Sequence, residues 1–372
     1  MTCSLSLDFS GSLTMKRILI CLDGTWNSSG ATAAPSATNV ARLYQNAIKS
    51  NTASQVAFYS EGVGTRFFEK IRGGLFGYGL YEQIKDGYHH IMDVYKPGDQ
   101  IIITGFSRGA FSARCLASFV TECGILKEEK KSLFSFGDQR TVDHLWDLYK
   151  NRQSDPAALR NFCSQNCHPP TDTMVGAVAV WDTVGALGVP WEIFGASKIA
   201  DKAQEHENER LGFLDLKLST RIARGYHAVA LDEQRVPFQP TLWDDPRVAT
   251  GQILQVWFAG AHSNVGGGFG DRGLSDISLD WMIRQLRKNH GLILEPVLPD
   301  PEGIWDPVGI TGMDTKAAKL DGNIVDTQKP REVPPNSLLH PSAELRKKGN
   351  PPRRAAIPTT AIIRHPYTVS EN

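Results

Sequence analysis

A serine flanked by glycines, placed where an apolar strand meets a helix, constrains the fold of this chain more than any other feature. The segment Gly105-Phe106-Ser107-Arg108-Gly109 follows an apolar run at residues 101–103 and opens a helical pattern at residues 110–120. In this context a Gly-x-Ser-x-Gly motif is typical of a nucleophile elbow, a strained strand-to-helix turn that exposes the serine hydroxyl. Side chains at the two glycine positions would collide with the neighbouring strand and helix. The motif therefore predicts a sheet with Ser107 at its carboxyl edge.

Short apolar runs alternate with helical patterns along the chain. Strands are expected at residues 17–22, 55–59, 100–104, 174–181, 226–231 and 253–258, and helices at 38–48, 79–95, 110–120 and 274–289. Either Thr38 or Asn39 can provide the N-cap of the first helix. This order predicts an α/β fold with a doubly wound, mostly parallel sheet covered by helices on both faces.

The composition excludes several classes of partner. Lysine plus arginine and aspartate plus glutamate are equal, at 40 each, so no broad positive field favours nucleic acid. The six cysteines fit neither a disulfide scaffold nor a zinc module, and we expect reduced thiols, no metal and no cofactor. The N-terminus lacks the basic region of a secretory signal peptide, and no apolar stretch reaches the roughly 18 residues that span a bilayer, which favours a cytoplasmic location.

A nucleophilic serine needs a neighbouring base and a group that orients the base. His262 is the best candidate base, because it follows the strand at 253–258, where loops at the carboxyl edge of a sheet form sites. His227 lies inside a strand and is more readily explained as a packed residue. Asp182 and Asp232 each end a strand and preserve the order serine, acid, histidine. Fold logic alone does not separate these two acids.

Five motifs in one order resemble a known family. They are Ile20 to Asn27, Gly62 to Thr65, Gly105 to Ala110, Trp181 to Gly185 and His262 to Gly268. Together they resemble the uncharacterised α/β-hydrolase family that includes the catalytic domain of type VI secretion phospholipase effectors. The resemblance implies a Ser107, Asp182 and His262 triad, and so favours Asp182 over Asp232. An aspartate often stands in that family where this chain has Asn264, which puts in doubt a charge-dependent role at that position.

The resemblance also implies a function and a site of action. It implies a serine hydrolase that cleaves carboxylic esters, with phospholipid as a substrate class, transient contact with a membrane surface, and delivery by a secretion system. For the oxyanion, the backbone N–H of Arg108 is one expected donor, and the loop of Asp23, Gly24 and Thr25 is the expected source of another.

The expected domain organisation has three parts. Residues 1–15 are expected to be a disordered leader, residues 16–319 an α/β-hydrolase-like catalytic domain, and residues 320–372 an extension whose prolines predict coil. Insertions are expected near residues 124–172 and 190–220, and the second, aromatic and strongly charged, suits a cap over a site.

Two other interpretations compete with an esterase. The first is a catalytically silent hydrolase fold that serves as a binding module, which an active-site probe would distinguish. The second is dinucleotide binding, because residues 268–273 fit Gly-x-Gly-x-x-Gly between a strand and a helix. The proline-rich remainder lacks the further strands that a dinucleotide-binding half requires.

Overall fold

The computed structural model describes most of the chain in separate stretches. They are residues 15–24, 36–50, 53–62, 76–127, 136–185, 217–235, 238–297, 319–320, 323–324, 330–347, 362–363 and 367–369. Residues 1–14 of the expected leader at 1–15, Thr25, and most of the expected cap at 190–220 lie outside the described residues.

Eight strands form one sheet, in the order β14-β12-β8-β7-β6-β3-β1-β2. Its six longer strands are β1 (Arg17–Leu22), β2 (Gln55–Ser60), β3 (Gln100–Phe106), β6 (Met174–Trp181), β7 (Arg224–Ala230) and β8 (Ile253–Phe258). All neighbouring pairs in this sheet run parallel. The structure thus confirms an α/β fold with a mostly parallel sheet, in which β3 lies between β6 and β1.

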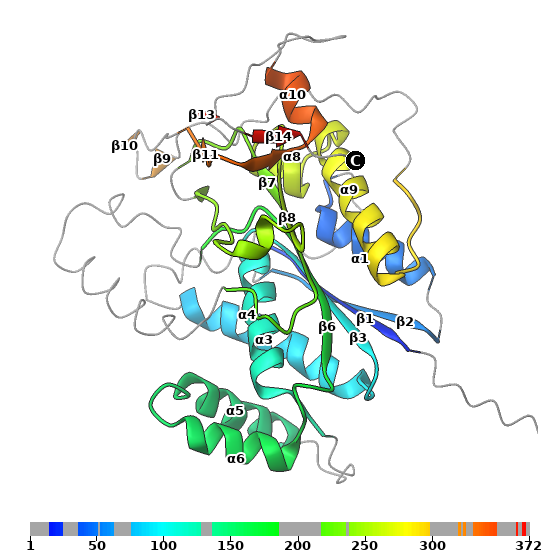
Figure 1. Cartoon of the computed structure of the whole chain (residues 1–372), viewed down its shortest axis with the longest axis vertical. Helices are drawn as coiled ribbons and strands as arrows, with labels where there is room; N and C mark the ends of the chain where they lie inside the picture. Colours follow the sequence, from blue (N-terminus) through cyan, green and yellow to red (C-terminus); the bar gives the residue numbers. More distant parts are fainter. Residues whose placement is uncertain are drawn as a thin grey trace, which may run out of the picture.

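Helices cover both faces of the sheet (Figure 1). On one face α3 (Phe76–Val94) and α4 (Arg108–Cys123) pack against alternate side chains of β1, such as Ile18 and Ile20. On the other face α1 (Asn39–Lys49) and α9 (Gly273–His290) pack against the intervening residues, such as Leu19. Since strand side chains alternate between faces, the continuous apolar run of β1 serves two cores.

Local sequence explains where the first helix begins. The side chain of Thr38 accepts a hydrogen bond from the N–H of Ala41, so Thr38 is the N-cap of α1. The Thr38 hydroxyl also donates to Asp23, which ties the start of α1 to the carboxyl end of β1.

The described residues of the expected insertion, 124–127 and 136–172, lie beside α4. They contain β4 (Ile125–Leu126), α5 (Phe136–Lys150), α6 (Pro156–Asn166) and β5 (Cys167–His168). Trp146 of α5 packs edge-on against Tyr81 of α3 and Phe119 of α4. Figure 1 shows α5 and α6 at one end of the molecule and α10 at the other. No disulfide joins the cysteines of the described stretches.

The coil prediction for residues 320–372 is wrong for part of this extension. The short strands β12 (Ser337–Leu339) and β14 (Tyr367–Val369) extend the main sheet beyond β8, and α10 (Pro341–Lys347) follows β12. The remaining short strands are β9 (Lys319–Leu320), β10 (Asn323–Ile324), β11 (Glu332–Val333) and β13 (Ile362–Ile363). Pro334 and Pro335 stand just before β12, and Leu339 of that strand is fully buried against Trp257 in a third apolar cluster. Burial of a few apolar residues therefore outweighs the local preference for coil.

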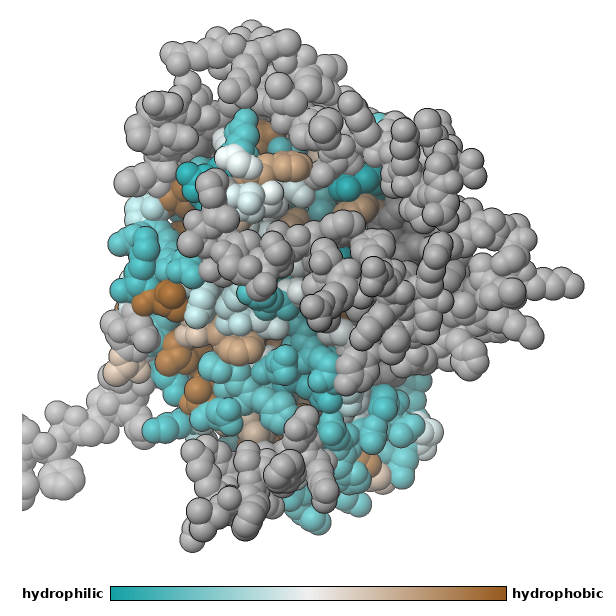
Figure 2. Space-filling view, turned by 180° about the vertical axis from the view of Figure 1, so that it is seen from behind, coloured by the Kyte–Doolittle hydropathy of each residue, from teal (hydrophilic) through white to brown (hydrophobic). Residues whose placement is uncertain are grey.

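The described surface on the face in Figure 2 is largely hydrophilic, with apolar side chains in small separate groups. Among the described residues, the large apolar side chains that are exposed are Met15, Met174, Ile293 and Val369. Within the described ranges, no helix has the length and hydropathy needed to cross a membrane.

Candidate active site

The register of three parallel strands brings the predicted residues to one edge. Phe106 of β3 pairs with Trp181 of β6, so Ser107 and Asp182 are the next residues on neighbouring strands. Ala228 of β7 pairs with Trp181, and its carbonyl accepts from the N–H of Asp182 at 2.8 Å. Because carboxyl ends of parallel strands lie at the same edge, both side chains leave the sheet there.

Ser107 lies on a strained turn between β3 and α4. Its φ of 59° falls in the left-handed region, which residues other than glycine rarely adopt. A Cβ on Gly105 would lie 2.3 Å from the carbonyl oxygen of Gly109, and one on Gly109 would lie 2.2 Å from that of Leu22. Only glycine at both positions permits this close approach of strand, turn and helix.

The imidazole of His262 contacts the carboxylate of Asp182. His262 begins the short helix α8 (His262–Gly266), and its Nδ1 lies 2.6 Å from Oδ2 of Asp182. The rings of Phe106 and Phe238 pack against the imidazole, with centroids 4.5 and 4.9 Å away. Nε2 is buried, and within the described stretches no group hydrogen bonds to it. The arrangement holds one ring nitrogen against an acid and leaves the other for a further partner.

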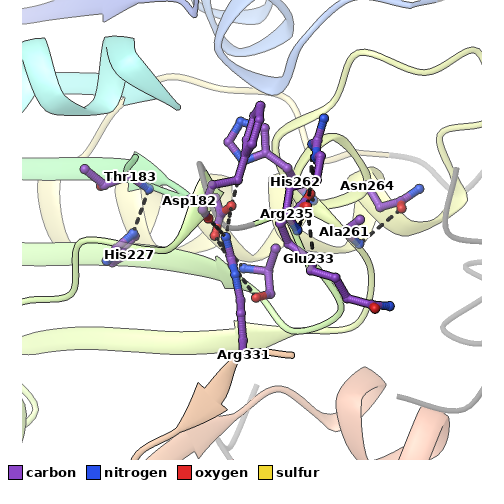
Figure 3. Close-up of polar contacts among 12 residues, drawn as sticks. Asp182, Thr183, His227, Glu233, Arg235, Ala261, His262, Asn264 and Arg331 are labelled. Atoms are coloured by element: carbon purple, nitrogen blue, oxygen red, sulfur yellow. Dashed lines mark hydrogen bonds and ion pairs between the residues drawn. The ribbon is translucent and has the colours of Figure 1, made fainter. Parts of the chain in front are cut away.

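Asp182 is fully buried and is held by more than the histidine (Figure 3). Oδ1 accepts from the N–H of Ala230 at 2.8 Å and from Nη1 of Arg331 at 2.7 Å, and Oδ2 accepts from Nη2 of Arg331 at 2.9 Å. Burial alone would raise the pKa of Asp182, but the Arg331 cation and the His262 contact outweigh burial and hold it well below its usual range. The carboxylate therefore stays ionised at neutral pH.

Arg331 is the residue of this site that the sequence did not reveal. It comes from the C-terminal extension, 149 residues after Asp182, and its side chain is fully buried. No motif surrounds it, and the neighbouring prolines predict only coil. The one available signal is that the residue is an arginine, because an arginine that becomes buried requires an acidic partner.

The competing acid Asp232 has a different position. Its Oδ2 accepts from the N–H of Gly260 at 2.8 Å, in the loop that leads to His262. The next residue, Glu233, accepts from the N–H of His262 at 3.3 Å and forms an ion pair with Arg235 at 2.9 Å. These acids hold the backbone around the histidine, whereas Asp182 contacts its ring.

His227 supports the segment that carries Asp182. Its Nε2 accepts from the N–H of Thr183 at 3.1 Å, and its Nδ1 lies 3.1 Å from Oε1 of Gln255. Burial, aided by the nearby Arg114 cation, lowers the pKa of His227 to about 3, so the ring stays neutral and can accept. The structure thus places this histidine in the packed position that its strand predicted.

Asp23 is buried beside the elbow, at the end of β1. Its Oδ2 accepts from the hydroxyl of Tyr59 at 2.7 Å, and its Oδ1 accepts from the N–H of Gly24 at 2.7 Å. Burial and the Asp23 charge raise the pKa of Tyr59, which keeps that hydroxyl protonated. A Cβ on Gly24 would lie 3.2 Å from Cβ of Ser107, so this loop runs close to the nucleophile position. Because Asp23 occupies the N–H of Gly24, another group of the loop would have to provide an oxyanion donor.

Arg108 begins α4 directly after Ser107. The first N–H groups of a helix have no acceptor within the helix, which makes the N–H of Arg108 suitable for an oxyanion. Burial lowers the pKa of its guanidinium to about 10, still well above neutrality.

Within the described part of the chain, no three His, Cys, Asp or Glu side chains cluster as metal ligands. Near His262, Oδ1 of Asn264 accepts from the N–H of Ala261 at 3.2 Å, a backbone contact that does not need a charge.

Comparison with known proteins identifies one family. Residues 16–285 match the family described as the catalytic domain of Tle1-like phospholipase effectors of the type VI secretion system. Over 161 residues, the chain is 28% identical to the uncharacterised protein YEL023C of Saccharomyces cerevisiae, a region that covers 39% of this chain and 22% of the yeast protein.

Two solved structures are similar at low identity. One is the Tle1 effector bound to the VgrG spike of the type VI secretion system, with 16% identity, a TM-score of 0.36, and coverage of 69% of this chain and 51% of that one. The other is an uncharacterised protein from Pseudomonas aeruginosa, with 16% identity, a TM-score of 0.42, and coverage of 78% and 49%. The chain therefore spans about half of these structures and about a fifth of the yeast protein.

Proposed function

The chain belongs to the family of Tle1-like phospholipase effector catalytic domains, and from this membership we propose that it is a serine hydrolase that cleaves carboxylic esters, phospholipids among them. Ser107 is the nucleophile, His262 the base and Asp182 the acid that orients the base. The observation that carries this proposal is the 2.6 Å contact between Nδ1 of His262 and Oδ2 of Asp182, at the sheet edge where Ser107 leaves β3.

The contact defines which nitrogen can act as the base. An ionised carboxylate only accepts hydrogen bonds, so the proton of neutral His262 resides on Nδ1 and Nε2 carries the lone pair. Nε2 is buried and unbonded within the described residues, as the acceptor of a serine proton would be before substrate binds. Catalytic hydrogen bonds are often long in free enzymes and shorten when substrate binds.

The reaction proceeds in two acyl-transfer steps. In the first, Oγ of Ser107 attacks the ester carbonyl, its proton passes to Nε2 of His262, and that proton then goes to the departing alcohol. In the second, water attacks the acyl-serine with the same histidine as base, which releases the carboxylic acid and restores Ser107. Asp182 remains ionised throughout and stabilises the imidazolium that forms in each step.

The negative oxygen of each tetrahedral intermediate needs hydrogen-bond donors. The N–H of Arg108, at the start of α4, is one proposed donor, and the loop that begins with Asp23 and Gly24 and continues to Thr25 in the sequence is the proposed source of the other. The hydroxyls of Thr38 and Tyr59 hold the Asp23 carboxylate, which fixes where this loop starts.

Phospholipid as the substrate class rests on the family description, as do transient contact with a membrane surface and delivery by a secretion system. Because the chain covers about half of the solved structures it resembles, the substrates and partners of those longer proteins are only proposed for it.

A panel of p-nitrophenyl esters and phospholipid vesicles tests the function. The purified chain should release acid from at least one of these substrates, and Ser107→Ala should not. Ser118→Ala is a matched control on the same helix, because Ser118 loses only a 3.3 Å contact with Tyr149. Turnover that survives in Ser107→Ala would rule out Ser107 as the nucleophile. If neither the wild type nor the variants hydrolyse any of these substrates, the result would favour a catalytically silent binding module.

A further inference from the structure

We propose that Arg331 is a positioning residue of this site, which keeps the Asp182 carboxylate ionised and turned towards His262. This inference rests on the proposed function, in which Asp182 orients the base. It assigns part of the active site to the C-terminal extension, beyond residue 285 where the family match ends.

The guanidinium of Arg331 holds both carboxylate oxygens at once. Nη1 lies 2.7 Å from Oδ1 and Nη2 lies 2.9 Å from Oδ2 of Asp182, and both side chains are fully buried. Such a bidentate pair fixes the plane of the carboxylate as well as its distance. Oδ2 is the oxygen that also contacts His262, so the plane set by Arg331 is the one the imidazole meets.

Backbone carbonyls fix the guanidinium in turn. Nη1 also donates to the carbonyl of Ala230, and Nη2 to that of Phe238. Ala230 ends β7, and the ring of Phe238 packs on His262, so the arginine joins three segments around the base. Figure 3 shows the Arg331 side chain reaching Asp182 from the side opposite His262.

The main sheet determines where Arg331 lies. Six residues further along, β12 begins and pairs with β8, the strand that leads to His262. The N–H of His340, just after β12, donates to the carbonyl of Trp257 at 2.9 Å. The extension is therefore anchored to the strand that leads to the base, and it supplies the counter-ion of the acid.

The charge of Arg331 has a chemical consequence. A fully buried carboxylate without a counter-ion would take up a proton or force one onto His262. With Arg331 present, the carboxylate stays charged while His262 is neutral, which is the state that accepts the serine proton. Removing the cation should therefore stabilise protonated His262 and shift activity to higher pH.

Other charged groups surround this pair on the neighbouring elements and would remain in the variants. They are His227, Asp232, Glu233 and Arg235 around Asp182 and His262, and Asp23 and Arg108 beside Ser107. Glu233 and Arg235 form an ion pair with each other, at 2.9 Å, that does not include Asp182. These residues are the same in the wild type and in an Arg331 variant, so a shift in the titration of His262 reports on Arg331 itself.

The test compares Arg331→Met and Arg331→Lys in the full chain. In Arg331→Met, an NMR titration of His262, assigned with His262→Gln, should move to higher pH, because a cation near the imidazole is lost. The acid limb of kcat/KM should follow, and kcat should fall about 10- to 100-fold with KM little changed. Arg331→Lys keeps the charge but not the fork, so its titration should stay near wild type while kcat falls in part.

Arg42→Met is the matched control, since it removes a partly buried arginine that pairs with Asp276 at 2.5 Å, away from Asp182. A merely structural role would lower the melting temperature of both Met variants and leave the His262 titration unchanged, which would overturn the proposal. If the wild type hydrolyses no ester, the proposed function fails, and the His262 titration still decides whether Arg331 controls this pair.

Discussion

Oδ2 of Asp182 lies 2.6 Å from Nδ1 of His262, although 80 residues separate them in the sequence. Asp182 follows β6 and His262 follows β8, with β7 between these strands in the sheet. The acid thus reaches the base across an intervening strand, whose Ala230 N–H holds the other carboxylate oxygen. This contact distinguishes Asp182 from Asp232, which instead binds the backbone of Gly260.

Asp182→Asn should remove most of the turnover. The amide can present its NH₂ group to Nδ1, which favours the wrong imidazole tautomer, a change that costs about 10⁴ in the serine-protease example. Asp232→Asn should cost far less in turnover and act mainly on the melting temperature, because Asp232 binds a backbone N–H near the base. Turnover and melting curves of both variants check this, and a large loss of rate confined to Asp232→Asn would move the acid to the end of β7.

Hydrolysis should rise with pH along a single acid limb. The base accepts a proton only when neutral, and an ordinary histidine changes charge between about pH 5 and 8. Asp182 should add no second limb in this range, because Arg331 and His262 hold its pKa well below the usual value. A rate profile of kcat/KM measures this, and a flat profile from about pH 5 to 8 would contradict a histidine base.

Gly109→Ala should destabilise the fold because the new methyl group has no room. Its Cβ would lie 2.2 Å from the carbonyl oxygen of Leu22, a backbone atom that cannot easily move. We expect a loss of about 3 kcal/mol or more, which lowers the melting temperature by about 6–12 °C. Gly270→Ala is the control, since no heavy atom lies within 4 Å of a Cβ built there. Equal melting temperatures for the two variants would mean that the elbow can accommodate a methyl group at position 109.

The folded state should lose stability as the pH falls below about 6.5, partly because of His340. Burial, with a smaller effect of the Arg284 cation, lowers the pKa of His340 to about 4. Above pH 7 the ring is neutral in both states and adds no pH dependence. Between about pH 6.5 and 4 the unfolded chain takes up the proton first, so stability falls with pH, by about 2 kcal/mol at pH 5.

His340→Asn tests this origin of the pH dependence. Asparagine can still accept from the N–H of Ser342, as Nδ1 of His340 does at 3.2 Å, but it does not titrate. Denaturant unfolding at pH 7.5 and 5 should show a smaller difference in the variant than in the wild type. An unchanged difference would assign the acid sensitivity to other groups, such as His290, whose pKa burial also lowers to about 4.

The sequence predicted those elements that have a clear local pattern of apolar residues or a local motif. The apolar run of β1 and the serine between glycines are local patterns, and their positions in the sheet follow from the rules for parallel strands. The choice between Asp182 and Asp232 was not local, since both end a strand at the same edge, and only the resemblance to a family favoured Asp182.

Arg331 could not be predicted for a related reason. Its contacts with Asp182 join residues 149 positions apart, and the chain between them includes all of β7, β8 and α9. Nothing in the local pattern around Pro334 and Pro335 distinguishes an arginine in coil from one that a short strand holds in the core. The burial of Leu339 against Trp257, which anchors β12 to the main sheet, is likewise a long-range effect.

Covalent labelling of Ser107 tests the central claim most directly. A fluorophosphonate reacts with an activated serine and not with an ordinary hydroxyl, because the reaction needs the base and the oxyanion donors. Intact-mass and peptide analysis of the wild-type chain should show one adduct, on the peptide that contains Ser107. His262→Gln should slow this labelling strongly, and Ser118→Ala should not. An adduct on another residue of an active wild-type chain would contradict this account. Full ester hydrolysis by Ser107→Ala would contradict it as well.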